Sequence, residues 1–111
     1  MAAKKPPLRK LVGLKRQRAE QALLSVQQDL TALTAELKHL EQELATLDGE
    51  GGGIEVHLLS YEHGFLQRQA QSIAACRALI LDKEAEYFAA REALKRAFDS
   101  EERLRKEEKL S

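Results

Sequence analysis

The sequence has few of the residues that fill a compact globular core. Its 111 residues include three phenylalanines, two tyrosines and no tryptophan, with only two prolines and six glycines. Ala, Leu, Glu, Gln, Lys and Arg dominate instead, and these side chains lose little rotamer freedom in a helix. The composition is therefore typical of long helices or coiled coils.

Other absences exclude whole classes of protein. The single cysteine, Cys76, cannot form an internal disulfide, which fits a reducing cytosol. No apolar run approaches the roughly 18 residues of a membrane span, and the charged start shows no secretory signal. The 18 basic and 18 acidic side chains cancel, which argues against a protein that coats nucleic acid with its whole surface. We expect a cytoplasmic helical protein.

A heptad pattern predicts the first helix, over residues 8–47, beginning just after Pro7. Extended backwards, the pattern meets Ala19, Arg16 and Val12, so the apolar seam weakens towards the N-terminus. Eight apolar residues carry the pattern at alternating spacings of three and four: Leu23, Val26, Leu30, Leu33, Leu37, Leu40, Leu44 and Leu47.

The glycine-rich segment 48–53 predicts a turn, because each glycine costs a helix about 1 kcal/mol relative to alanine. A second helix is expected over 54–109, although Gly64 could kink it or end a first short segment. Apolar residues recur there at intervals of seven: Leu59, Leu66, Ile73, Ile80, Tyr87 and Leu94. The seam positions between them are ambiguous: His63, Ala70, Cys76 or Arg77, Lys83 or Glu84, Ala90, and Ala97 or Phe98.

A short connection between two long helices predicts an all-α, antiparallel coiled-coil hairpin, with the second helix the longer and residues 1–111 forming a single unit. If the turn is centred on the glycines, residue i faces residue 101 minus i, to within about one turn of helix. The second helix would then overhang the first, leaving Phe98 and Leu104 without an intramolecular partner.

Charge is unevenly distributed along the chain. Residues 1–18 hold seven basic side chains and no acid, whereas residues 19–66 hold nine acids and one base. A parallel homodimer of the first helix would bring Glu36 near Glu41, and Glu43 near Asp48. Like charges at these flanking positions repel each other and disfavour such a dimer. We therefore expect an intramolecular hairpin that is monomeric on its own.

Motifs for catalysis, cofactors and metals are missing. The glycines at 49–53 are followed by Ile54 and Glu55, not by the lysine and hydroxyl residue of a phosphate-binding loop. His39, His63 and Glu43 could bind zinc across the hairpin, but ordinary surface histidines fit the pattern better. Cys76 has no identifiable base beside it. The sequence predicts no enzyme, no metal site and no cofactor.

The basic N-terminal segment has several possible uses. Docking to a protein is the first, ahead of simple solvation of the charges. A basic amphipathic helix at a membrane surface is partly consistent with Leu8, Leu11 and Leu14 among the lysines and arginines. Binding of nucleic acid is disfavoured, because residues 1–18 contain no aromatic base reader.

The N-terminal stretch resembles the start of the FliJ/YscO family of type III export proteins. The pattern Leu-x-x-Leu-x-x-Leu-Lys-x-x-Arg-x-x-x-Ala is present here as Leu8, Leu11, Leu14, Lys15, Arg18 and Ala22. The stretch from Ala89 to Leu104 is similar to the second helix of that family. The resemblance covers the whole chain in architecture.

The resemblance implies a non-enzymatic stalk of a flagellar or virulence export apparatus. Such a stalk docks in the export ATPase hexamer and contacts the membrane protein of the export gate, and export chaperones are further candidate partners. The docking residues would be Leu8, Leu11, Lys15, Arg16 and Arg18 from the first helix and Phe98, Arg103 and Leu104 from the second, with Tyr61 and Phe65 facing the gate. The alternative is a general coiled-coil adaptor or oligomerisation module.

Overall fold

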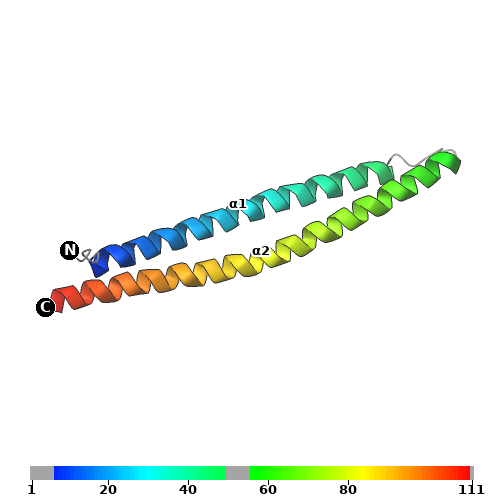
Figure 1. Cartoon of the computed structure of the whole chain (residues 1–111). Coiled ribbons are helices and arrows are strands. Elements are labelled where there is room, and N and C mark those ends of the chain that lie inside the picture. The colour runs from blue at the N-terminus through cyan, green and yellow to red at the C-terminus, as the bar shows by residue number, and fades with distance from the viewer. Residues whose placement is uncertain (1–6, 50–55, 111) are drawn as a thin grey trace, which may run out of the picture. The chain divides into compact units, whose positions relative to one another are not determined.

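The computed structural model describes the backbone of residues 7–49 and 56–110, and the side chains of residues 7–46 and 63–110. Helix α1 spans Leu8–Gly49 and helix α2 spans Val56–Leu110 (Figure 1). The chain is an all-α two-helix hairpin whose second helix is the longer, as the sequence predicts. Across the described residues no helix is apolar over a length that could cross a membrane.

The helix ends lie close to the predicted positions. The carbonyl of Pro7 accepts hydrogen bonds from the backbone N–H groups of Lys10 and Leu11, at 2.9 and 3.2 Å. Proline suits this place because the first turn of a helix needs no N–H donor. Helix α1 continues to Gly49, two residues beyond the predicted end, and most of the predicted turn lies outside the described residues.

Gly64 does not break α2, which is continuous from Val56 to Leu110. A Cβ atom at Gly64 would meet only a guanidinium nitrogen of Arg68, at the ordinary contact distance of 3.5 Å. The helix end considered at this position is therefore not present in the structure.

Alanine at Gly64 is expected to raise the free energy of unfolding by about 0.5–1 kcal/mol, because alanine has the higher helix propensity and fits without a clash. Urea unfolding followed by circular dichroism measures the change. The matched control is Gly13→Ala, where the added methyl group also has open space. A loss of stability at Gly64 alone would show that α2 is interrupted there in solution.

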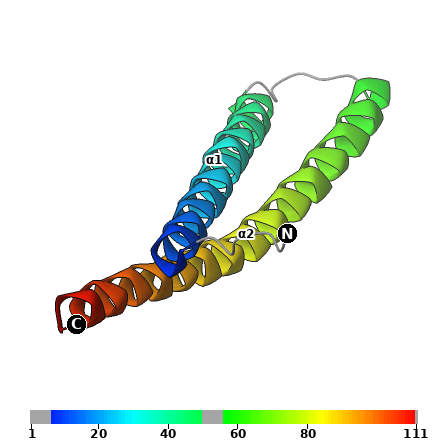
Figure 2. The same cartoon turned by 60° about the vertical axis from the view of Figure 1, so that its left-hand side comes forward.

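The chain forms two contact units, which are described separately. Unit 1 contains Met1–Gln28 and Ala85–Ser111, and unit 2 contains Asp29–Glu84. In both units a stretch of α1 packs antiparallel to a stretch of α2. Figures 1 and 2 both show the N-terminal end of α1 beside the C-terminal part of α2 in unit 1.

The most buried residues belong to unit 2. Ile73 and Cys76 are each 5% exposed, and Gln69 is 9% exposed. The Cys76 thiol donates to the carbonyl of Leu33 at 3.4 Å, and the Gln69 amide donates to Glu43 at 2.7 Å. Cys76 therefore behaves as a small core residue whose polar hydrogen has a backbone partner.

The ambiguous seam positions of α2 are now assigned. Cys76, Lys83 and Ala97 lie in the seam, whereas Arg77, Glu84 and Phe98 are exposed. The prediction that His63 and Ala70 lie in the seam was wrong, because both are exposed. Gln69 occupies the seam in place of Ala70. The reason is that the spacing of three and four is kept strictly, even where it selects a polar residue.

The predicted register was wrong. It placed Arg16 opposite residue 85 and Leu33 opposite residue 68, but Arg16 pairs with Glu101 and Leu33 contacts Cys76. The register follows the match of seams and ion pairs along the helices, not the centring of the turn on the glycines. In the observed pairs the α2 residue thus lies about two to five turns further towards the C-terminus than predicted.

The predicted overhang of Phe98 and Leu104 was also wrong. Leu104 is half-buried and lies with Val12 in one groove, and the Arg16 guanidinium carbon lies 5.9 Å from the centre of the Phe98 ring. Glu108, near the end of α2, pairs with Arg9 at 2.9 Å. In unit 1 the two helices therefore remain in contact almost to their ends.

Candidate docking surface

The seam of unit 1 contains one ion pair in an otherwise apolar row. Arg16 of α1 and Glu101 of α2 occupy seam positions, with their side chains 27% and 22% exposed and joined by a hydrogen bond of 2.5 Å. Arg16 also contacts Glu20 at 2.7 Å. Hydrogen bonds to Glu101 and then Glu20 raise the pKa of the Arg16 guanidinium, so it remains charged at any ordinary pH.

Two flanks run along unit 1, one on each side of this seam. Successive residues of an α-helix turn by about 100°, so Arg96 and Phe98 lie on different sides of the seam residue Ala97. In α1, Lys15 shares a groove with Arg96 and Ser100, which places it on the Arg96 side. We call the Lys15 and Arg96 side the basic flank and the Phe98 side the paired flank.

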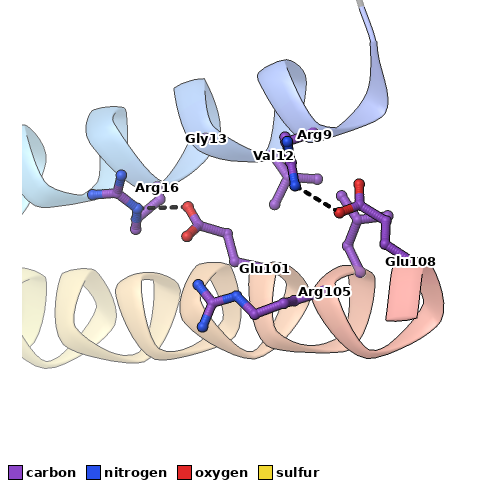
Figure 3. A pocket seen from close by; sticks show the side chains of 8 residues that line it. Arg9, Val12, Gly13, Arg16, Glu101, Arg105 and Glu108 are labelled. Atoms are coloured by element: carbon purple, nitrogen blue, oxygen red, sulfur yellow. Dashed lines mark hydrogen bonds and ion pairs between the residues drawn. The ribbon is translucent and has the colours of Figure 1, made fainter. Parts of the chain in front are cut away.

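On the paired flank the charges are neutralised within the chain. Figure 3 shows Arg9 pointing to Glu108 and Arg16 pointing to Glu101 across a groove that Gly13 and Arg105 also line. Arg105 in turn contacts Glu102 at 3.5 Å. Each surface pair contributes little stability, but together they neutralise the arginines that line this groove, whereas Arg91 and Lys95 on the same flank have no ion pair among the described side chains.

The basic flank has the opposite character. Lys15 and Arg18 from α1 and Arg96 and Arg103 from α2 have no ion pair among the described side chains. Three leucines accompany them on α1: Leu8, Leu11 and Leu14, which are 61%, 46% and 44% exposed. This surface therefore combines exposed apolar groups with positive charges that have no carboxylate partner among the described side chains.

Two adjoining grooves, of about 400 Å³ each, give the basic flank its shape. They share Lys15 as a common wall. The first is lined by Leu8, Leu11, Val12, Leu14, Lys15 and Arg18, all from α1. The second lies between the helices and is lined by Lys15, Ala19, Ala93, Arg96, Ala97 and Ser100.

The structure separates the predicted docking residues into three groups. Those on the basic flank are Leu8, Leu11, Lys15, Arg18 and Arg103. Arg16 and Leu104 belong to the seam, and Phe98 lies on the paired flank, 48% exposed. Phe65, predicted to face the export gate, is half-buried, and the side chain of Tyr61 lies outside the described residues.

The sequence did not predict Arg96 as a site residue, nor the alanine floor, the row of Ala19, Ala93 and Ala97 at the bottom of the groove between the helices. Arg96 precedes Ala97, which the sequence left undecided against Phe98 as the seam residue. The strict spacing of three and four from Leu94 would have put Ala97 in the seam and Arg96 next to it, but only the observed register brings Arg96 to Lys15.

The described side chains form no cluster of three or more histidine, cysteine or acidic residues that could hold a metal ion. His39 contacts Glu43 at 2.7 Å on the same helix, and His63 is exposed. The zinc site considered from the sequence is thus not assembled. The arrangement in unit 1 offers contact surface and charge, and the chemistry it supports is binding.

Comparisons of the sequence with protein-family models and with curated proteins, and of the fold with solved structures, give no match.

Proposed function

We propose that this protein is a non-enzymatic stalk of a type III export apparatus, acting in the cytoplasm at the base of a flagellum or a virulence secretion system. In this role unit 1 docks in the export ATPase hexamer, and the hairpin links that ring to the membrane protein of the export gate. Export chaperones are further candidate partners. The protein is expected to be a monomer until it meets them.

The basic flank is the observation that supports this proposal most directly. The residues that carry the resemblance to the FliJ/YscO family include Leu8, Leu11, Leu14, Lys15 and Arg18, and all five line one groove. Residues that served only the hairpin would be expected in the seam, where they would be covered by α2. Leu8, Leu11 and Leu14 are instead exposed, as expected of a surface that contacts another molecule.

The mechanism that fits a hairpin of this kind is allosteric. A single stalk inside a ring of identical subunits contacts them unequally, so it can favour one conformation in some subunits and promote assembly or turnover. No residue of the stalk takes part in the chemistry of ATP hydrolysis. Its contribution is differential binding to the conformations of the ring.

The purified protein is expected to stimulate its cognate export ATPase, and Arg18→Glu is expected to reduce that stimulation at least about fivefold, because it reverses a charge on the docking surface. The matched control is Arg91→Glu, an exposed arginine of unit 1 that stacks on Tyr87 and lies away from the basic flank. Equal stimulation by wild type and Arg18→Glu would exclude the basic flank as the docking surface.

A general coiled-coil adaptor is the second candidate, and the exposed rings of the other flank favour it. Phe88 is 65% exposed and Phe98 is 48% exposed. Burial of these rings in a stable dimer would identify an oligomerisation module. Light scattering decides between the two, since the stalk is expected to be a monomer and the adaptor a dimer that Phe98→Ser dissociates.

A further inference from the structure

The distribution of ion pairs in unit 1 is asymmetric in a way that the hairpin itself does not require. On the paired flank Arg9 pairs with Glu108 and Arg105 with Glu102, and in the seam Arg16 pairs with Glu101. On the basic flank, Lys15 and Arg96 face one groove with no acid in its lining. The acids on this side of α2, Glu86 and Glu107, already have interactions of their own.

Small side chains line the groove between the two helices on the basic flank. Ala19, Ala93, Ala97 and Ser100 line the groove between the helices, with Lys15 and Arg96 at its edges. The distance at which two helices pack is set by the side chains between them, so small residues allow a third helix to come close. The three exposed leucines of α1 extend this surface towards the N-terminus.

From these observations we propose that the basic flank binds an acidic amphipathic helix of a partner protein, which lies along the groove between α1 and α2 in unit 1. The inference rests on the proposed function for the existence of a docking partner, and adds the chemistry by which that partner is recognised. Carboxylates on the incoming helix would pair with Lys15, Arg18, Arg96 and Arg103. Its apolar side chains would cover Leu8, Leu11 and Leu14.

A helix fits this surface better than a membrane or a nucleic acid does. A lipid surface could reach the exposed leucines, but the alanine floor lies between two helices, where only a narrow element can enter. Single-stranded nucleic acid is bound by aromatic side chains that stack on bases. The described lining of both grooves contains no aromatic ring.

The test uses a synthetic peptide of about 28 residues, long enough to be helical alone, with leucines along one face and glutamates on both sides of them. Titrated into the full chain labelled with nitrogen-15, it is expected to shift the amide signals of Lys15, Ala19, Ala93 and Arg96. Binding should weaken as salt is added, because exposed charges are screened. A peptide with lysine in place of every glutamate should not bind.

Two double variants make the test specific. Lys15→Glu with Arg96→Glu is expected to weaken binding at least about tenfold, whereas Arg91→Glu with Lys95→Glu, on the paired flank, should leave it unchanged. All four side chains are exposed, and circular dichroism verifies that both variants remain helical.

Three results would overturn the inference. They are no binding of the acidic peptide, signal shifts confined to the Phe98 side, and binding to phosphatidylglycerol vesicles without binding to the peptide. The peptide test does not involve the ATPase. A positive peptide test without ATPase stimulation would therefore leave the inference standing and reject the proposed function, and the reverse result would reject only the inference.

Discussion

Aspartate in place of Ile73 is expected to lower the free energy of unfolding by at least about 4 kcal/mol, so that urea unfolds the variant at a much lower concentration. Ile73 is 5% exposed, so the change removes a buried aliphatic group from the best-covered part of the seam. It also places a carboxylate there without a partner. Since small domains are stable by only about 5–15 kcal/mol, this loss should appear as a clear fall in the urea midpoint measured by circular dichroism.

The matched control for this prediction is Leu81→Asp in the same unit. Leu81 is 67% exposed, so the substitution puts a carboxylate into water and should change the free energy of unfolding by about 0.5 kcal/mol or less. If both variants were equally stable, Ile73 would not be buried in solution. If both unfolded, a surface such as that of a dimer would cover Leu81.

Glutamate in place of Arg16 is expected to give the second large effect, a clear fall in the unfolding temperature. The arginine pairs with both Glu101 and Glu20, and it lies over the Phe98 ring. Replacing it brings three carboxylates together at a partly covered seam position. The fall should be smaller in high salt, because salt screens the repulsion.

The double variant Arg16→Glu with Glu101→Arg restores an opposite-charge pair in the same register, so it should recover more than half of the lost unfolding temperature. Glu101→Arg alone should also destabilise, because it places two arginines at one seam position. An additive effect of the two single changes in the double variant would show that the side chains do not meet, and that the register in solution is different.

Periodicity was sufficient to predict the helices and most of their seams. Alternation by three and four along Leu23–Leu44 and from Ile73 to Leu94 reports which face is covered, and the half-buried residues of α1 follow it without a gap. Even the polar seam position Arg16 was included by extending the pattern backwards. The continuity of α2 through Gly64 was not predictable, since one glycine costs little in a helix that is held by packing.

The register could not be predicted in the same way. A heptad seam repeats, so sliding one helix along the other by seven residues again matches apolar with apolar residues. The choice depends on the few positions that break the repeat, such as Arg16 with Glu101 and Gln69 with Glu43. Those pairs can be recognised only once the two helices are aligned.

Only the part of the candidate site that lies on one helix could be predicted, because the rest depends on the register. Leu8, Leu11, Lys15 and Arg18 are neighbours on one helix, so spacing alone places them on one face. Arg96 joins them from α2, and Phe98 is separated from them, only because of the register and the seam phase. Residues contributed by a second helix thus required the structure.

The ion pair between Arg9 and Glu108 has a consequence for the topology of the chain. These residues are 99 positions apart in the sequence, yet their side chains are joined at 2.9 Å. A peptide linker of only a few residues between Leu110 and Leu8 could therefore close the backbone into a ring. Closure would remove conformations mainly from the unfolded chain, and new termini could then be opened elsewhere as a circular permutant.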